Sequence, residues 1–171
     1  MPLTVADPNI RILPFDDLSL SQLYQLLALR QKVFCVEQQC PYQDVDCLDQ
    51  HAWHVLLSER HPANAPLLAY ARILPPGVVE KNDACIGRVV SDPAFRGQGL
   101  GKKVMHVAID FCQKQFPAAG ISLSAQSYLH DFYHSLGFSN TGEFYLEDNI
   151  PHQKMRRPAG LTATLSTGSP A

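Results

Sequence analysis

The order of apolar and polar positions along the chain predicts strands and helices in mixed succession. Alternation of the two kinds predicts a short first strand over residues 9–13. Apolar residues at three- and four-residue spacing then predict a long amphipathic helix over 19–36, capped by Ser19 or Asp17. Three apolar segments bounded by turn residues follow, at 51–59, 67–74 and 84–90. Because short turns join the three segments, we expect an antiparallel meander.

The next part of the chain predicts a parallel crossover. Apolar positions at helical spacing predict a helix over 104–116, and the alternating residues 121–125 predict a strand after it. A strand that follows a strand–helix unit usually pairs in parallel with the first strand, through a right-handed crossover. The strand over 121–125 is therefore expected to lie beside the strand over 84–90.

The last elements are a short helix and a hairpin. The helix is expected over 127–136, with Ser127 as its N-cap and Gly137 as the residue that ends it. The strands of the hairpin are expected over 142–146 and 150–157, with a turn between them. No internal repeat and no second domain are expected.

Length and composition favour one globular domain. The chain has 171 residues, of which 46% are hydrophobic and 18% are charged. We expect a single domain over residues 1–157 and a disordered C-terminal tail over 158–171. A formal net charge of -2 argues against a nucleic-acid-binding protein. No apolar run approaches the ~20 residues of a membrane span, and residues 1–7 lack the basic start of a signal peptide.

The cysteines indicate reduced thiols in a cytoplasmic protein, because their number is odd and their spacing irregular. They are Cys35, Cys40, Cys47, Cys85 and Cys112. The last two fall in strand and helix patterns, where small core residues are expected. Cysteine and histidine residues also cluster between residues 40 and 54, but no C-x-x-C pair occurs there. Residues three apart on a strand point to opposite faces, so we expect no metal site.

The segment 37–50 carries acidic residues and lies within a stretch without Lys or Arg, between Lys32 and Arg60. Two interpretations are open for these carboxylates: a solvated acidic loop, or a surface that attracts a cationic amine. The residues are Glu37, Asp44, Asp46 and Asp49. Arg30 lies near the apolar stripe of the preceding helix. A buried Arg there needs a carboxylate or carbonyl partner.

A glycine-rich turn, residues 92–103, separates the strand over 84–90 from the following helix. A helix start has backbone N–H groups without intrahelical partners and the positive end of the helix dipole, so its natural ligand is a phosphate. The dinucleotide fingerprint fails because Lys102 stands at its third glycine. The Walker A motif fails because Arg96 stands at its first glycine and Lys103 at its Ser/Thr position.

Two motifs resemble those of the GNAT superfamily of N-acetyltransferases. The turn resembles the family's Q/R-x-x-G-x-G/A signature, here Arg96-x-x-Gly99-x-Gly101. The end of the short helix resembles a second family motif, here Phe132-Tyr133-x-x-x-Gly137-Phe138. The resemblance implies an α/β (α+β) protein with the GNAT acyl-CoA N-acyltransferase fold, in which helices flank a mixed, twisted central sheet of about seven strands.

A narrower resemblance is to the ElaA-like branch of that superfamily. Its pattern is carried by the segments 30–46, 69–74, 86–89 and 150–152. Together with the two motifs, these segments extend the resemblance over roughly residues 10–157. The branch does not name a substrate.

The family resemblance implies transfer of the acetyl group of acetyl-CoA to a primary amine by direct attack in a ternary complex. The acceptor is expected to be a small molecule or a peptide or protein, and a homodimer is one expected assembly. Two alternatives are open. One is a non-catalytic acyl-CoA-binding or regulatory module. The other is a homoserine-lactone-synthase-like acyltransferase, which would need a long-acyl carrier and a basic docking surface that the sequence does not show.

The resemblance also implies which residues bind the cofactor. The pantetheine is expected along the main chain of Val89, Val90 and Ser91. The pyrophosphate is expected over Arg96, Gly97, Gln98, Gly99, Leu100 and Gly101, with Lys102 as an added charge or as a solvated helix residue. Gln126 stands at the family's cofactor-contacting Asn position. Tyr133 stands at the general-acid position near the thioester sulfur, and its alternative is a core tyrosine.

The sequence offers several candidates for the general base that would deprotonate the amine. An amine of pKa ~10 must lose a proton before it can attack. Ile121 stands where some family members carry a Glu base, so that base is absent. The candidates are Glu37, His54 and His152. Each candidate also has a structural alternative. Glu37 could pair with Arg30 or Arg72 and serve only the fold. Each histidine could be a core or surface residue whose hydrogen bonds are satisfied.

Overall fold

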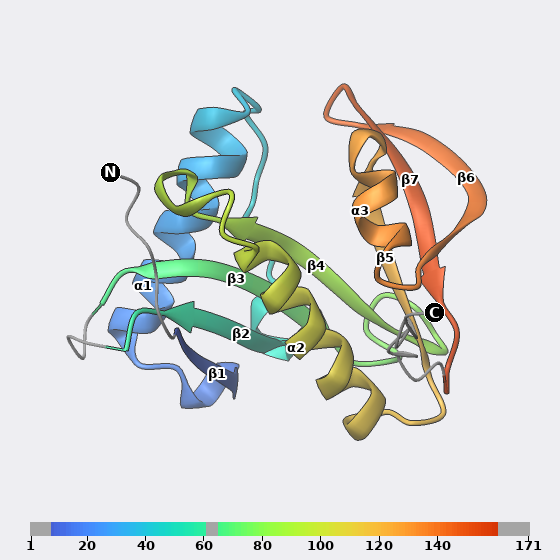
Figure 1. Ribbon diagram of the computed structural model, residues 1–171, viewed down its shortest axis with the longest axis horizontal. Helices are drawn as coiled ribbons and strands as arrows, with labels where there is room; N and C mark the ends of the chain where they lie inside the picture. Colours follow the sequence, from blue (N-terminus) through green and yellow to red (C-terminus); the bar gives the residue numbers. More distant parts are fainter. Residues whose placement is uncertain (1–7, 61–64, 161–171) are drawn as a thin grey trace, which may run out of the picture.

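The computed structural model describes residues 8–60 and 65–160 and arranges them as one mixed sheet with helices on both faces (Figure 1). Residues 1–7, 61–64 and 161–171 lie outside the described part. The expectations for the N-terminus and for most of the C-terminal tail therefore fall on residues that are not described.

The described sheet has the strand order β1-β2-β3-β4-β5-β7-β6. Its strands are β1 (Asn9–Pro14), β2 (Trp53–Ser58), β3 (Leu67–Leu74), β4 (Asp83–Ser91), β5 (Gly120–Gln126), β6 (Ser139–Glu147) and β7 (Ile150–Arg157). Strands β1 to β4 are antiparallel neighbours, which confirms the meander. Strand β5 is parallel to β4, which confirms the expected pairing of these two strands.

The C-terminal hairpin is longer than predicted, because β6 begins at Ser139. Its two-residue turn has positive φ at both positions, 49° at Asp148 and 63° at Asn149. Asp and Asn tolerate this conformation, which the common hairpin turns require. The turn sets the register in which Tyr145 pairs with His152, so these two side chains lie on one face.

The first helix is divided into two segments. Helix α1 spans Leu20–Arg30 and begins with a capping box between Ser19 and Gln22, as the sequence predicted for Ser19. A π-helical segment, Gln31–Glu37, follows it where a continuous α-helix was expected. The Gln38 N–H bonds to the Val33 carbonyl at 3.0 Å, five residues back, so each turn here holds an extra residue.

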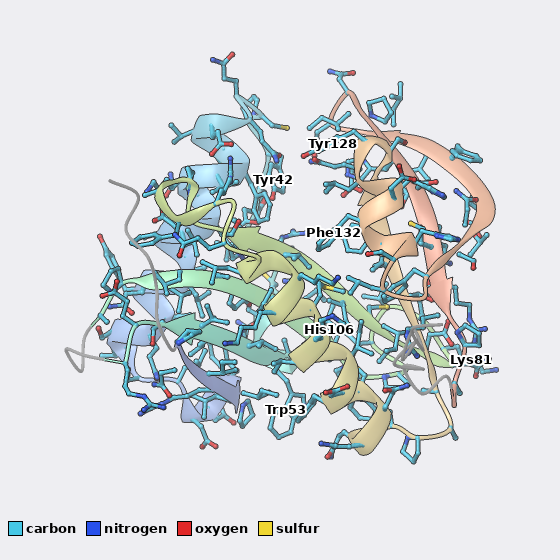
Figure 2. All side chains as sticks on the ribbon, in the orientation of Figure 1. Tyr42, Trp53, Lys81, His106, Tyr128 and Phe132 are labelled. Carbon is cyan, nitrogen blue, oxygen red and sulfur yellow. The ribbon has the colours of Figure 1, made fainter. Side chains whose placement is uncertain are left out.

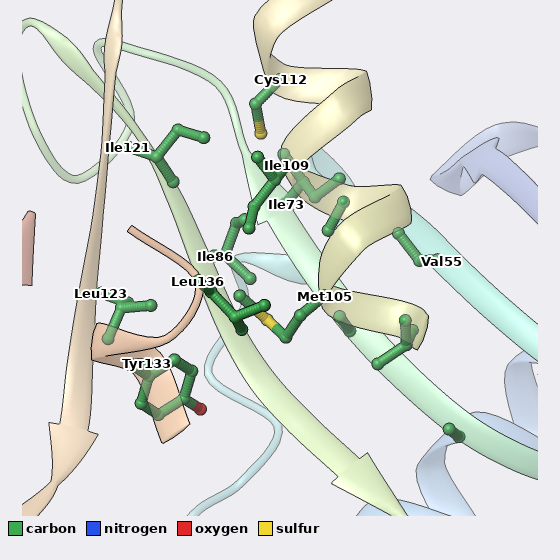
Figure 3. Packing of buried hydrophobic residues seen from close by; sticks show 14 of the residues in the cluster. Val55, Ile73, Ile86, Met105, Ile109, Cys112, Ile121, Leu123, Tyr133 and Leu136 are labelled. Carbon is green, nitrogen blue, oxygen red and sulfur yellow. The ribbon is translucent and has the colours of Figure 1, made fainter. Parts of the chain in front are cut away.

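Two apolar cores lie on opposite faces of the sheet. Helix α2 (Leu100–Gln115) covers one face, and Figure 3 shows its side chains against those of the strands. The labelled helix residues there are Met105, Ile109 and Cys112, and the strand residues include Val55, Ile73 and Ile86. Helix α1 covers the other face through Leu26 and Leu29, and the π-helical segment adds Val33. Strand β3, at the centre of this packing, is buried along its whole length, so it is removed from water on both faces.

The last helix starts later than predicted. Ser127 opens a 3-10 turn, Ser127–Leu129, and helix α3 spans only His130–His134. Ser127 is therefore not the N-cap of the helix, and neither segment has a side-chain cap. The predicted stop is confirmed, because Gly137 has a φ of 86° and donates its N–H to the His134 carbonyl at 3.0 Å.

Candidate active site

Strands β4 and β5 part after a short ladder. Only Asp83 to Cys85 pair with residues of β5, and β4 contains a bulge at Arg88, whose φ is 52°. Past the ladder, the β4 edge that faces β5 lines a cleft of about 790 Å³. The parted strands thus expose backbone donors and acceptors to a ligand-sized space.

The cleft brings together residues that the sequence analysis singled out in separate segments. It is lined by Glu37, Val89, Val90, Ser91, Arg96, Gln126, Tyr133 and His152. The rest of the predicted phosphate loop does not line it. Those residues continue from Arg96 into the start of α2, and they are Gly97, Gln98, Gly99, Leu100, Gly101 and Lys102.

The glycine loop has the geometry of an anion site. Gly97 and Gly99 have φ values of 81° and 72°, a conformation that favours glycine, and Gly99 is the N-cap of α2. The Lys103 N–H makes the first helical hydrogen bond, to the Gly99 carbonyl at 2.9 Å. The N–H groups just before it belong to the first turn and have no carbonyl four residues back. With the helix dipole, they favour a phosphate.

Tyr133 is buried on α3 and still borders the cleft. Its ring packs edge-to-face against Phe132 and Phe138, with ring centroids 5.0 and 6.2 Å away, and Figure 3 shows its hydroxyl on the side facing β4. Burial, and then the neighbouring Tyr128, raise the pKa of the Tyr133 phenol. The phenol is therefore protonated at neutral pH and is able to donate a proton.

Glu37 has a different partner from the two that were expected. Its carboxylate is held by Arg96, with 2.6 Å from Nη1 to Oε1 and 3.0 Å from Nη2 to Oε2. Pairing with Arg30 or Arg72 was wrong, because other carboxylates occupy both guanidinium groups. The pair is partly exposed, with 39% of the Glu37 side chain and 44% of the Arg96 side chain accessible.

Arg30 forms the centre of a buried charge network. Its side chain is 0% exposed, and it bonds to Asp44 at 2.7 Å and to Asp49 at 2.8 Å. The expected carboxylate partner of Arg30 is thus confirmed. Burial by itself would raise the pKa of Asp49, but hydrogen bonds and charge from Arg30 and Arg72 outweigh it and hold that pKa below its usual value.

The same network extends to β3 and β4. Arg72 bonds to Asp46 at 2.7 Å and to Asp49 at 2.9 Å, and Arg88 lies 3.1 Å from Asp46. Neither interpretation of the acidic loop is right for its Asp residues, because arginines from three elements neutralise them. The loop is instead anchored to the sheet, and its residues Tyr42 and Leu48 line the cleft together with Arg72 and Arg88.

His54, the third candidate base, lies away from the cleft. It is fully buried, with Nδ1 2.8 Å from the Tyr70 hydroxyl and Nε2 3.0 Å from the Asp49 carbonyl. Since a carbonyl only accepts, Nε2 carries the proton. Burial lowers the pKa of His54 and keeps it neutral. His54 is therefore placed as a core histidine with both ring nitrogens hydrogen-bonded, which was the structural alternative to a general base.

The hairpin supplies a polar face that the sequence analysis did not identify. Tyr145 stacks on His152 with 6.1 Å between ring centroids, and its hydroxyl lies 2.5 Å from Ser124 Oγ. Ser124 in turn donates to Glu147 Oε2 at 3.2 Å. The alternating pattern of the predicted hairpin was the signal that could have found this face, because residues two apart point the same way.

Aromatic side chains stand at the mouth of the cleft. Tyr42 from the acidic loop and Tyr128 from the turn before α3 lie on opposite sides of it (Figure 2). The Tyr42 hydroxyl donates to Asp44 at 2.9 Å, and its ring lies 5.6 Å from the Arg88 guanidinium carbon. The loop and the hairpin also meet where Cys40 Sγ lies 3.9 Å from the Asp148 carbonyl.

The described residues show neither a metal site nor a membrane span. Within them, no group of three or more His, Cys, Asp and Glu side chains is placed to hold a metal ion. The five cysteines are free thiols, with Cys112 buried and Cys85 partly buried. No helix in the described ranges is long and apolar enough to cross a membrane.

Comparisons with known proteins agree with the architecture of the sheet and cleft. A family model described as "Acetyltransferase (GNAT) domain" matches residues 41–158. ElaA of Escherichia coli is 42% identical over 149 residues, covering 82% of this chain and 90% of that protein. A UPF0039 protein of Schizosaccharomyces pombe is 40% identical over 143 residues, covering 83% and 91%.

Solved structures give the same result. An acyl-CoA N-acyltransferase from Pseudomonas aeruginosa superposes with a TM-score of 0.81 at 42% identity, covering 88% of this chain and 99% of that one. The crystal structure of Escherichia coli ElaA superposes with a TM-score of 0.80 at 39% identity, with the same coverage. The chain therefore belongs to the GNAT superfamily of acyltransferases and has the GNAT acyl-CoA N-acyltransferase fold. Within the superfamily, it belongs to the ElaA-like branch.

Proposed function

We propose that this protein transfers the acetyl group of acetyl-CoA to a primary amine of a small molecule, peptide or protein. The amine attacks the thioester directly in a ternary complex. The observation that carries this proposal is the cleft between β4 and β5, which places an open strand edge, Arg96 and a buried, protonated Tyr133 around one space. No metal is required for this chemistry.

The donor half of the site is the β4 edge and the start of α2. The amides of the pantetheine pair with the main chain of Val89, Val90 and Ser91 like an added strand. The pyrophosphate lies against the N–H groups of residues 97–102 and the Arg96 guanidinium, with Lys102 as a further positive charge. Gln126, which lines the cleft and donates to Gln38 at 3.3 Å, contacts the cofactor from β5.

Tyr133 acts as the general acid. When the tetrahedral intermediate collapses, the carbon–sulfur bond breaks and the sulfur takes the phenol proton. The raised pKa of Tyr133 supports this role, because the phenol retains its proton until the thiolate forms.

His152 is the better candidate for the general base. Its Nδ1 lies 2.8 Å from the Ile150 carbonyl, which accepts only, so Nδ1 carries the proton and Nε2 has a free lone pair. Both oxygens of Glu37 are engaged by Arg96. We therefore assign Glu37 to the donor loop, where it balances the charge of Arg96.

Calorimetry with acetyl-CoA, combined with a thiol-release assay against a panel of amines, tests the proposal. Saturable, amine-dependent release of CoA is the expected result. Binding without turnover on any amine would instead identify a non-catalytic acyl-CoA-binding module. Turnover only with long acyl groups on a carrier would identify the homoserine-lactone-synthase-like alternative.

A cytoplasmic location and a homodimer also remain proposals. Phe144 and Leu146 are each 69% exposed on β6, which is an edge strand of the described sheet. They would supply apolar surface to a contact between two copies. Sedimentation analysis over a range of protein concentrations tests this assembly.

A further inference from the structure

A chain of hydrogen bonds fixes one carboxylate beside His152. The Tyr145 hydroxyl donates to Ser124 Oγ at 2.5 Å, and the Ser124 hydroxyl donates to Glu147 Oε2 at 3.2 Å. That Glu147 oxygen lies 4.0 Å from His152 Nε2. Three strands of the sheet therefore converge to hold an oxygen and a ring nitrogen side by side at the cleft.

Both atoms are hydrogen-bond acceptors, and among the described residues Glu147 Oε2 accepts from the Ser124 hydroxyl at 3.2 Å. Nδ1 of His152 is committed to the Ile150 carbonyl, so the lone pair is on Nε2. The carboxylate of Glu147 also only accepts. Two acceptors 4.0 Å apart are both reached by one ammonium nitrogen at a normal hydrogen-bond distance of about 2.8 Å from each. The angle at that nitrogen is then about 90°, roughly 20° below the tetrahedral angle between two N–H bonds, so each hydrogen bond bends by only about 10°.

Glu147 also differs in its pairing from the other glutamates of the cleft. Glu37 is held by Arg96, and Lys154 pairs with Glu80 at 2.7 Å and lies 3.9 Å from Glu143. In the described part of the chain, Glu147 makes no ion pair with a Lys or Arg. Its side chain is half exposed, so its charge is available to a ligand in the cleft.

We propose that Glu147 and His152 together bind the acceptor as a primary alkylammonium ion and remove its proton. This inference rests on the proposed function and deepens it, because it identifies the acceptor as a basic, positively charged amine. Glu147 holds the cation, Tyr145 and Ser124 position Glu147, and His152 receives the proton.

The proton balance of the step is complete. An N–H bond of the ammonium breaks and its proton goes to His152 Nε2. The freed nitrogen lone pair forms a bond to the thioester carbon, and the carbon–sulfur bond then breaks. The sulfur takes the proton of Tyr133, the new amide nitrogen returns its second proton to the Tyr133 phenolate through water, and His152 releases its proton to solvent. The products are the amide, the CoA thiol and one proton.

A pair of isomeric acceptors tests the inference. Benzylamine is an ammonium ion at neutral pH, whereas para-toluidine is already neutral. We expect Glu147→Gln to raise the KM for benzylamine about tenfold, because a charge-assisted hydrogen bond is lost. We expect His152→Gln to lower kcat for benzylamine about 100-fold, the usual size of a general-base contribution. Rates with para-toluidine should change less than about twofold in both variants.

The matched control is Glu143→Gln. Glu143 lies on the same strand and the same cleft face, but it lies near Lys154. This variant should leave KM and kcat unchanged for both acceptors. Unchanged affinity for CoA in all three variants shows that they are folded. Full benzylamine activity in Glu147→Gln or His152→Gln, or equal losses with both isomers, would overturn the inference while leaving the acetyltransferase proposal standing.

A binding measurement separates the two proposals if no amine is turned over. In ¹⁵N spectra, benzylamine should shift the His152 Nε2 resonance of the wild-type protein and leave that of Glu147→Gln in place. Such a shift without any thiol release would support the ammonium site and contradict the acetyltransferase function. No shift in the wild-type protein would overturn the inference.

Discussion

The Arg96 guanidinium, at the start of the glycine-rich turn, donates from Nη1 and Nη2 to the two carboxylate oxygens of Glu37. The two hydrogen bonds measure 2.6 and 3.0 Å. Glu37 ends the π-helical segment that leads into the acidic loop, so the pair joins that loop to the glycine-rich turn. A second ion pair between the same two regions, Lys32 with Asp92 at 3.0 Å, reinforces the junction.

Glu37→Gln should strengthen CoA binding and preserve turnover. If the pyrophosphate binds as proposed, the Glu37 carboxylate competes with it for Arg96 and repels the phosphates, so its removal should lower the Kd for CoA by about two- to fivefold. Isothermal titration at low and high salt measures the effect, which should shrink as salt rises. Weaker binding would show that the carboxylate instead orders Arg96 for the phosphate. A large loss of kcat would restore Glu37 as a candidate base.

Tyr133→Phe should slow turnover far more than it weakens binding. Loss of the phenol proton should lower kcat by about 100-fold, as expected for general-acid catalysis, with little change in acetyl-CoA affinity. Single-turnover kinetics and calorimetry on the same preparations measure the two effects. Tyr128→Phe is the control, because this exposed tyrosine also lines the cleft. Equal turnover by wild type and Tyr133→Phe would eliminate the general-acid assignment.

Arg30→Met should destabilise the fold strongly. Removing one partner leaves the buried carboxylates of Asp44 and Asp49 short of compensation, which should lower the unfolding free energy by about 3–5 kcal/mol. Lys32→Met is a matched control two residues along, because its ion pair with Asp92 is exposed and should contribute less than about 1 kcal/mol. Urea denaturation measures both. Similar losses in the two variants would contradict the structural role of the buried network.

Stability should fall as the pH is lowered from about 4 to about 2, through the protonation of Asp46. Burial alone would raise the pKa of Asp46, but hydrogen bonds and charge from Arg72 outweigh it and lower that pKa to about 2. The unfolded chain then binds more protons than the folded one within this range, so acid favours unfolding. The lowered pKa values of Asp49 and Asp83 act in the same direction.

Urea midpoints across that pH range, for the wild type and for Asp46→Asn, measure this contribution. The variant should be less stable at neutral pH and should show a shallower dependence on pH. Parallel curves for the two proteins would mean that Asp46 has nearly the same pKa in the folded and unfolded states.

Local patterns predicted the order of the elements because they depend on neighbours along the chain. The capping box at Ser19, the left-handed residue at Gly137 and the positive φ of Gly97 and Gly99 all follow from short-range backbone chemistry. Such patterns failed at two places. They predicted that the last helix starts at Ser127, whereas α3 starts at His130, and they did not predict the π-helical segment. Both depend on how the chain packs against the rest of the fold rather than on propensity alone.

By itself, the sequence determined the class of this protein: the helix and strand periods, the glycine turn and the Tyr133 motif are all encoded within short segments. Only the tertiary structure decided what the charged residues do. Arg30 and Asp49, or Ser124 and Glu147, are far apart along the chain and meet through strand register and loop closure. Electrostatic pairing acts through space, so the neutralised acidic loop and the carboxylate beside His152 emerge only when the sheet is assembled.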